Sequence, residues 1–439
     1  MALDIKFLQQ EVFEQYMADD DNRPWIIGFS GGKDSTMLLQ LVWTTINKID
    51  PILRTRPVHV VCNDTLVENP KIAQFIRKTL YNIQEQAVKQ GMPLTVHETT
   101  PRLEESFWVN LIGKGYPAPN NTFRWCTERL KINPTTEFIK SKISEIGEVI
   151  ILLGTRSAES STRARSIKKY EVKGERLRKH VLPNAYVFAL IKDVETDEVW
   201  QYLLQNDPGW GGTNRDLITL YRNASGGDCP LVIDTTTPSC GNSRFGCWVC
   251  TVVKKDKSMS ALIDNGEEWM EPLADFRDML QENRNKRELR DTKRRGSYIE
   301  DENTWGPYTE DHRAEMLKTL LEAQKEVQKS EPELVLINAQ ELVGIQVTWH
   351  RDSLFRFSVA DIYNSVYGTD LKLQDFAVQD IFEQEILKEV FVDDTDFNLI
   401  KELLEVQKSK YILVSNYGLQ NDLDNHLERH VKTKKENVH

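Results

Sequence analysis

The sequence has no long apolar run, and this excludes one large class of proteins. Of its 439 residues, 40% are hydrophobic and 28% are charged. No apolar stretch approaches the roughly 20 residues that a membrane-spanning helix needs. The first residues include acids and amides where a secretory signal peptide has an apolar segment. We therefore expect a cytoplasmic globular protein without a membrane partner.

Positive charge is also in short supply. The sequence has 56 Lys and Arg against 67 Asp and Glu, a net charge of −11. This excludes a surface that is basic throughout, as in proteins coated by nucleic acid. Two local segments differ: residues 161–180 hold eight basic residues against two acids, and residues 284–295 hold seven against two. Either segment can contact DNA phosphates, face a partner protein or simply be solvated.

Cysteine is scarce and unevenly placed. Of six cysteines, four lie between 229 and 250, and none follows Cys250. Their spacing is C-x(10)-C-x(6)-C-x(2)-C, which in a cytoplasmic protein indicates a metal or cluster more than disulfides. Structural zinc usually has two close ligand pairs, and this pattern has one. The spacing therefore favours a [4Fe–4S] cluster over zinc or unligated thiols, with the candidate ligands Cys229, Cys240, Cys247 and Cys250.

A polar glycine loop follows the first apolar run. Residues 25–28 predict a buried strand, Ser30-Gly31-Gly32-Lys33-Asp34-Ser35 a loop, and residues 37–42 part of a helix. The loop lacks the G-x-x-x-x-G-K-[ST] spacing of a Walker A motif. Adjacent glycines let the backbone approach a ligand, and the start of a helix offers free N–H groups to an anion. We expect phosphate to bind here, and an ordinary strand-to-helix turn is the alternative.

Strands and helices alternate through the first half of the chain. Further strands are expected at 58–62, 94–97 and 149–153, with helices at 4–17, 71–89, 103–112, 134–146 and 193–205. This order predicts an α/β fold with a doubly wound parallel sheet and ligands at the carboxyl ends of the strands. We expect four regions: a nucleotide domain at 1–210, a cysteine-rich iron–sulfur insertion at 211–257, a charged helical extension at 258–330 and a mostly helical or α+β region at 331–439.

Two acidic residues follow strand ends. Asp34 can cap the helix after the loop or hold Mg²⁺ against phosphates. Asp64, after the second strand, can reach a ribose or the metal, or can be an ordinary turn residue. The sequence leaves these alternatives open.

The motif S-G-G-K-D-S resembles the PP-loop of ATP pyrophosphatases. Three later segments resemble the phosphoadenosine phosphosulfate (PAPS) reductase branch of that superfamily: 63–70, 154–163, and the R-x-C-x(4)-K-x-x-P element that begins at Arg124. The resemblance implies that residues 30–35 bind ATP. The cations Arg124, Lys131, Arg156 and Arg163 form a candidate anion cradle, because Arg and Lys bind phosphate well. Surface ion pairs with Glu128 and Glu159 are the alternative.

Two cysteines stand outside the cluster pattern. Cys126 lies between Arg124 and Arg129, whose charges are expected to lower the thiol pKa and favour a sulfur-carrying thiolate; a plain structural thiol is the alternative. Cys62 lies in an apolar strand and is expected to pack in the core.

The combination of PP-loop domain, cysteine group and charged extension resembles the DndC sulfurtransferases of bacterial DNA phosphorothioation, or the related SspD family. That resemblance covers about residues 1–330 and implies a [4Fe–4S] cluster, ATP and Mg²⁺. It also implies DNA, a cysteine desulfurase and an ATPase among other phosphorothioation proteins as partners. The catalytic candidates are Lys33, Asp34, Cys126 and Arg156, and the nucleotide ligands are Ser30, Gly31, Gly32, Lys33, Asp34, Ser35, Asp64 and Arg163.

The hypothesis that follows is a two-stage reaction. ATP adenylylates a DNA phosphate with release of pyrophosphate, and sulfur then displaces AMP. Three rivals use the same nucleotide fold: a PAPS or adenylylsulfate reductase, a tRNA-thiolating enzyme, and a non-catalytic iron–sulfur assembly subunit. The reductase usually has a catalytic cysteine in a C-terminal segment, and this sequence has none after Cys250.

Overall fold

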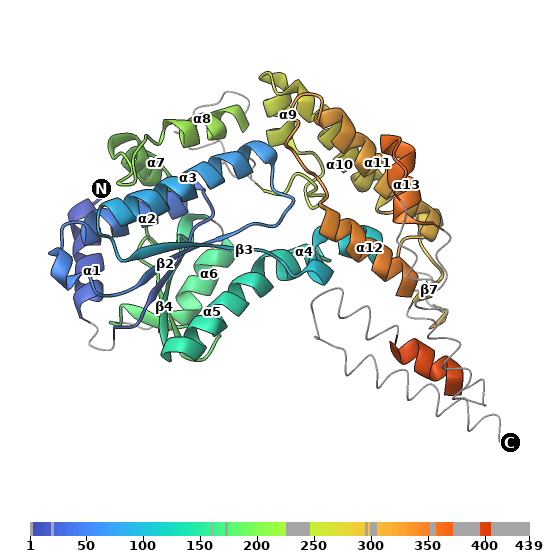
Figure 1. Ribbon diagram of the computed structural model, residues 1–439. Helices are drawn as coiled ribbons and strands as arrows, with labels where there is room; N and C mark the ends of the chain where they lie inside the picture. Colours follow the sequence, from blue (N-terminus) through green and yellow to red (C-terminus); the bar gives the residue numbers. More distant parts are fainter. Residues whose placement is uncertain are drawn as a thin grey trace. The chain divides into compact units, whose positions relative to one another are not determined.

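The computed structural model describes residues 3–18, 22–159, 161–171, 174–224, 246–294, 297–298, 305–351, 357–371 and 396–404. At a few of these positions, Arg163 among them, it describes the backbone alone. The chain divides into two compact units: Met1–Pro101 with Asn121–Ala274, and Arg102–Asn120 with Asp275–His439 (Figure 1). The sequence did not indicate that Arg102–Asn120 groups with the C-terminal half, and the four regions predicted from the sequence stay a prediction.

A six-stranded sheet forms the centre of the first unit, in the order β3-β2-β1-β4-β6-β5. Five strands are parallel: β1 (Trp25–Gly28), β2 (Val58–Asn63), β3 (Leu94–Thr99), β4 (Val149–Leu152) and β6 (Ala185–Phe188). The edge strand β5 (Leu177–Lys179) is antiparallel to β6. The order reverses at β1, between β2 and β4, which is the switch point where open α/β sheets bind ligands. The prediction of an α/β fold built on a mostly parallel sheet is confirmed.

Helices cover both faces of this sheet because the central strands are apolar on both sides. In β1, Trp25 and Ile27 pack into the larger core, which includes residues of α1 (Ile5–Met17), α2 (Lys33–Ile46), α3 (Pro70–Lys89) and α7 (Thr196–Gln205). Ile26, between them, belongs to a separate core with Ile139 of α5 (Asn133–Ile146). Alternate residues of one strand thus bury against helices on opposite faces, as in a doubly wound sheet.

The remaining elements of this unit are short or lie outside the sheet. They are η1 (Pro51–Leu53), α4 (Trp125–Thr127), the π-helix η4 (Glu128–Ile132), η5 (Ser157–Glu159), α6 (Ser161–Tyr170), α8 (Arg215–Ala224), α9 (Lys257–Asp264) and η6 (Glu268–Met270). The helix α10 (Glu271–Asn283) contains the border between the two units.

Two expectations about local structure were wrong or incomplete. The helix expected at 103–112 is a 3₁₀ turn, η2 (Leu103–Glu105), followed by a π-helix, η3 (Val109–Gly113). In the π-helical turn Lys114 N donates to Val109 O, five residues back. The strands β5 and β6 were not predicted. The helix expected at 193–205 begins at Thr196, where Glu195 and Glu198 form a capping box.

The second unit is mainly helical. Beside η2 and η3 it contains η7 (Arg287–Leu289), the hairpin β7 (Lys293–Arg294) and β8 (Ser297–Tyr298), α11 (Glu310–Val327), α12 (Ala339–Arg351) and α13 (Val359–Tyr367). Two buried indoles join its segments: Trp108 donates to Leu336 O at 2.7 Å, and Trp349 donates to Ile112 O at 3.1 Å. None of the helices that the structure describes combines the length and apolarity of a membrane span.

Candidate active site

The glycine loop joins β1 to α2 as the sequence predicts. Phe29 N donates to Val61 O at 2.9 Å, which continues the pairing of β1 with β2 up to the loop. Gly31 has φ +70°, and a Cβ at this position would lie 2.5 Å from Cγ1 of Ile76. Both the backbone angle and the close contact therefore require glycine. Gly32 is the N-cap of α2 and provides no side chain to cap it.

The start of α2 leaves an anion-binding edge on the loop. Thr36 N makes the first helical hydrogen bond, to Gly32 O at 3.0 Å. Within the described residues, no hydrogen-bond acceptor meets the backbone N–H groups of Gly31, Gly32, Asp34 and Ser35. The hydroxyl of Ser35 lies 3.3 Å from that of Ser30 and donates to Gly32 O at 3.0 Å. Free N–H groups and the positive end of the helix dipole favour a bound phosphate.

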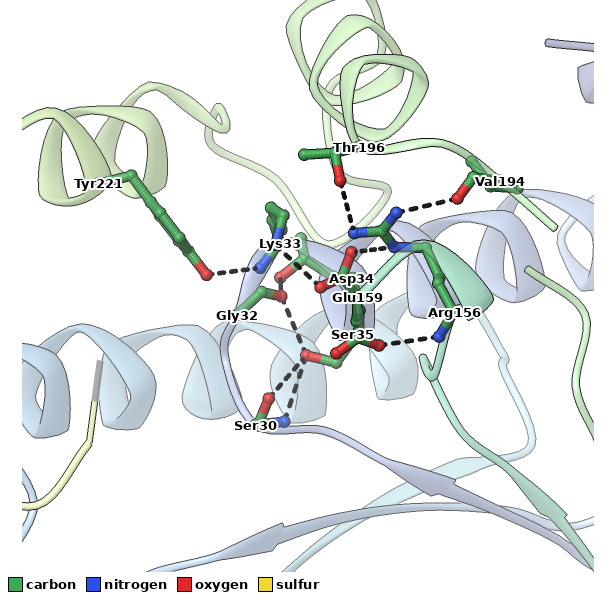
Figure 2. Close-up of polar contacts among 11 residues, drawn as sticks. Ser30, Gly32, Lys33, Asp34, Ser35, Arg156, Glu159, Val194, Thr196 and Tyr221 are labelled. Atoms are coloured by element: carbon green, nitrogen blue, oxygen red, sulfur yellow. Dashed lines mark hydrogen bonds and ion pairs between the residues drawn. The ribbon is translucent and has the colours of Figure 1, made fainter. Parts of the chain in front are cut away.

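Asp34 lies between two cations (Figure 2). Its Oδ2 is 3.1 Å from Lys33 Nζ, and its Oδ1 is 2.6 Å from Arg156 Nε. Gly32 is the N-cap, and no side chain in the described part of the chain caps the helix, so the alternative in which Asp34 caps α2 is wrong. The Mg²⁺ alternative stays a prediction: a carboxylate is a suitable ligand, and its charge is held here by the two cations.

Arg156 is almost completely buried, with 1% of its surface exposed. Besides Asp34, its guanidinium donates to Val194 O at 2.9 Å and to Thr196 Oγ1 at 3.2 Å. Its backbone N–H donates to Glu159 Oε1 at 2.8 Å. Arg156 is therefore not part of a surface ion pair with Glu159. In this structure its charge holds Asp34, and direct contact with phosphate stays a prediction.

Gly154 brings the end of β4 against the start of α2. A Cβ at Gly154 would lie 2.9 Å from the backbone carbon of Asp34 and 2.9 Å from Ser35 N. Backbone atoms cannot yield as a flexible side chain can, so only glycine allows this approach. The close approach places Arg156, two residues further on, next to Asp34.

Tyr221 of α8 contacts the loop and was missed by sequence reasoning. Its hydroxyl accepts from Lys33 N at 3.4 Å and would lie 3.3 Å from a Cβ on Gly32. Its ring centroid is 5.8 Å from Lys33 Nζ and packs edge-on against Trp200 at 4.9 Å. The apolar residues Leu217 and Tyr221, four apart on one helical face, were the available signal.

Asp64 follows β2 and forms a turn. Its Oδ1 accepts from Leu66 N at 2.8 Å, and Leu66 has φ +64°. This is the turn alternative considered for Asp64. A second role at the ribose or metal stays a prediction.

The segment with Cys247 and Cys250 pairs with the chain after β2. Trp248 N donates to Val67 O at 3.0 Å, and Asn69 N donates to Gly246 O at 3.2 Å. Burial, then the charge of Glu68, raises the pKa of Cys247 to about 12. Cys229 and Cys240 lie outside the described residues. Within the part of the chain that is described, no three His, Cys, Asp or Glu side chains converge to hold a metal, so the four-thiolate site stays a prediction.

Cys126 of α4 lies next to this segment, but its electrostatics differ from the prediction. Burial raises its pKa, and the charge on Cys250 raises it further. The expectation that Arg124 and Arg129 lower this pKa is wrong. Arg124 is exposed and donates to Asn121 Oδ1 at 3.1 Å. The second thiol outside the cluster pattern, Cys62, is buried in the core as expected, with a pKa raised to about 12 mainly by burial.

Lys131 provides positive charge at the cysteines. Its Nζ is 3.6 Å from Glu68 Oε1, and the negative charges of Cys247 and Glu68 raise its pKa. Thr65 Oγ1 donates to the same carboxylate oxygen at 2.9 Å and lies 3.4 Å from Cys247 Sγ. The four cations predicted to form one anion cradle therefore lie in different places. Arg156 lies at the loop, Lys131 lies at the cysteines, and Arg124 contacts Asn121. Arg163 belongs to α6, and its side chain is outside the described atoms.

Comparison with known proteins places this site in a family. The phosphoadenosine phosphosulfate reductase domain matches residues 24–253, more than half of the chain. Uncharacterized protein MJ0066 of Methanocaldococcus jannaschii is 29% identical over 189 residues, 42% of this chain and 32% of that protein. The chain thus matches about a third of that relative's length.

A solved structure of phosphoadenylyl-sulfate (PAPS) reductase from Candida auris, a phosphate complex, is 16% identical. The match covers 47% of this chain and 88% of that one, with a TM-score of 0.28. Members of the matched family are enzymes of nucleotide-linked sulfur chemistry. By the extent of its match, the chain belongs to the phosphoadenosine phosphosulfate reductase domain family.

Proposed function

We propose that this chain is an ATP-dependent sulfurtransferase of DNA phosphorothioation, resembling DndC or SspD. One observation carries the ATP half of the proposal. Among the residues that the structure describes, none accepts from the backbone N–H groups of Gly31, Gly32, Asp34 and Ser35, which lie beside the Lys33 ammonium. This arrangement suits a pyrophosphate group.

The first step would activate a DNA phosphate. A non-bridging oxygen of the phosphodiester attacks the α-phosphorus of ATP, a new P–O–P link forms, and the bond to the β-phosphate breaks. The departing pyrophosphate carries the electron pair into the loop. The free N–H groups, the Ser30 and Ser35 hydroxyls and Lys33 stabilise its charge, which is the main demand of such a transfer.

Asp34 is the residue of the loop that would hold Mg²⁺. Arg156 and Lys33 fix its carboxylate from two sides, at 2.6 and 3.1 Å. A carboxylate that is already oriented requires less rearrangement when a cation and phosphates bind. Mg²⁺ bound there would neutralise phosphate charge.

In the second step sulfur replaces AMP. A P–S bond forms as the P–O bond to AMP breaks. If sulfur arrives as a persulfide on Cys126, supplied by a cysteine desulfurase, a thiol reductant must then cleave the remaining S–S bond and restore the Cys126 thiol. Lys131 lies among these sulfurs, and its charge favours anionic forms of Cys126 and Cys247. A [4Fe–4S] cluster on Cys229, Cys240, Cys247 and Cys250 would supply sulfide or electrons at this stage.

DNA contact is proposed for the basic segment 284–295 of the second unit. The guanidinium groups of Arg287 and Arg290 each lie 5.9 Å from the ring centroid of Trp305. Arginines with an aromatic neighbour are a common surface for phosphates and bases. In the other basic segment, 161–180, Arg176 already pairs with Glu11 and Glu14. A partner ATPase and other phosphorothioation proteins remain proposed partners.

Pyrophosphate release by the purified holo-protein with ATP, Mg²⁺ and DNA tests the ATP half. We expect Lys33→Ala to reduce the rate at least tenfold, and Lys48→Ala to leave it unchanged. Lys48 is a matched control because it lies just after the other end of α2 and bonds Gln9 at 2.9 Å. No release by the wild type, or equal rates in both variants, would reject an ATP pyrophosphatase.

A second candidate is a PAPS reductase-like oxidoreductase, which the family match supports equally. It predicts sulfite formation from PAPS with a thiol donor and no need for ATP. A tRNA-thiolating enzyme would place sulfur on a base, and an assembly subunit would show no turnover.

A further inference from the structure

Two imidazoles lie together on the sheet, among residues that the proposed sulfur transfer does not use. His59 belongs to β2, and Thr95 and His97 belong to β3. In the register of these strands His59 is opposite Thr95, and Val61 is opposite His97. Residues two apart on a strand share a face, so the three polar side chains project to the same side. Phe138 of α5 covers that side, with ring centroids 6.1 Å from His59 and 4.9 Å from His97.

Three atoms of this group form a nearly equilateral triangle. His59 Nδ1 lies 2.9 Å from Thr95 Oγ1 and 3.0 Å from His97 Nε2, and the third side, from Thr95 Oγ1 to His97 Nε2, is 3.0 Å. A neutral imidazole nitrogen either donates or accepts, and the hydroxyl has one hydrogen. Two hydrogens at most serve the three contacts. A cation bound by all three atoms would make every contact favourable.

We propose that His59 Nδ1, His97 Nε2 and Thr95 Oγ1 form three adjacent positions in the coordination shell of a divalent transition metal ion. Ligands at right angles, with bonds of about 2.1 Å, are about 3.0 Å apart. All three observed separations match this distance between neighbouring ligand atoms. Imidazole nitrogen favours Ni²⁺, Co²⁺ or Cu²⁺ over Mg²⁺ and Ca²⁺, and right angles suit the tetragonal shells of Ni²⁺ and Cu²⁺ better than the tetrahedral shell of Zn²⁺. Water would complete the shell, because the three side chains are only partly covered.

The surroundings keep both imidazoles in the form that binds metals. Burial lowers the pKa of His97, and burial with the neighbouring His97 charge lowers that of His59 to about 4. Both rings are thus neutral near pH 7 and offer lone pairs without first losing a proton. The charged groups that face the pair from α5 are Lys142 and Glu145, which pair with each other at 2.7 Å. Their opposite charges largely cancel at the site.

Calorimetric titration of the anaerobic holo-protein with Ni²⁺ tests this site. We expect a binding event that weakens at least tenfold in His59→Gln and in His97→Gln. His350→Gln is the matched control, since His350 is an exposed histidine of α12, and it should bind as the wild type does. Thr95→Val keeps both imidazoles and should weaken binding severalfold. If the histidine variants do not fold, the Thr95→Val variant still tests whether the metal binds at this site.

A variant at Cys247 distinguishes Ni²⁺ binding at the imidazoles from Ni²⁺ binding at the cysteines. If Ni²⁺ binds at the imidazoles, Cys247→Ser should retain the binding event, and the bound Ni²⁺ should lack thiolate charge-transfer absorption. The proposal is overturned if Ni²⁺ does not bind, if the folded variants at 59, 95 and 97 bind like the wild type, or if Cys247→Ser abolishes the event. None of these outcomes depends on ATP turnover, so this proposal and the proposed function can fail separately.

Discussion

Replacing Arg156 by lysine keeps the charge and removes the geometry that holds Asp34. The guanidinium meets three acceptors, Asp34 Oδ1, Val194 O and Thr196 Oγ1, at 2.6, 2.9 and 3.2 Å. A lysine ammonium in the same space reaches one of them, because it lacks the planar fork. A buried acceptor left unpaired costs about 1–3 kcal/mol, and the partly buried Thr196 Oγ1 costs about 1 kcal/mol, so Arg156→Lys should lower the free energy of unfolding by about 2–4 kcal/mol.

The matched control is Arg176→Lys. Arg176 also bonds carboxylates, on Glu11 and Glu14, but about a quarter of its side chain is exposed. A pair that is partly solvated contributes less than about 1 kcal/mol. Denaturant unfolding measures both variants, and pyrophosphate release measures function. We expect Arg156→Lys to lose at least about tenfold in rate, which corresponds to about 1.4 kcal/mol in the barrier. Equal stability and equal turnover in the two variants would refute the assigned role of Arg156.

Three further predictions concern separate parts of the chain. Gly154→Ala should abolish pyrophosphate release in a folded protein, because the added methyl meets the backbone of Asp34 at 2.9 Å; unchanged kinetics would contradict the close approach. Burial raises the pKa of Glu341 from 4.5 to about 7. The free energy of unfolding should therefore be highest below pH 4.5 and fall by about 3 kcal/mol as the pH rises to 8. Glu341→Gln should remove that pH slope in denaturant unfolding, and an unchanged slope would assign it elsewhere. Trp305→Ala should weaken DNA binding severalfold at fixed salt. Arg287→Gln should weaken binding and also reduce the dependence of the DNA affinity on salt concentration. Normal DNA binding by both variants would exclude this surface.

The strongest sequence signals concerned the centre of the sheet and the loop. Residues 25–28 and 149–152 are apolar on both faces, a pattern that predicts buried parallel strands, and the glycines at 31 and 32 indicate a tight loop between strand and helix. The structure agrees at each of these points. Strands β5 and β6 were harder to predict. Leu177–Lys179 is a short and largely polar edge strand, and Ala185–Phe188 has only four residues.

The site was less predictable because it depends on contacts between distant segments. Arg124 and Arg129 lie close to Cys126 in the sequence, but burial and then the charge of Cys250 raise its pKa. The guanidinium of Arg156 pairs with Asp34, whereas the nearby Glu159 accepts from the Arg156 backbone N–H. Tyr221 reaches the loop from a helix that carries no motif. Local sequence indicates which residue types are present, whereas burial and tertiary pairing determine their protonation and role.

Sulfur placement in the product tests the central claim most directly. The measurement is mass spectrometry of nuclease digests after incubating the holo-protein with DNA, ATP, Mg²⁺, a cysteine desulfurase, a thiol reductant, the partner proteins and isotopically labelled cysteine. The account predicts labelled phosphorothioate-linked dinucleotides that require ATP and disappear with Lys33→Ala. The account would be contradicted if the DNA stayed unlabelled while, under matching conditions, the protein formed sulfite from PAPS or placed labelled sulfur in a tRNA base.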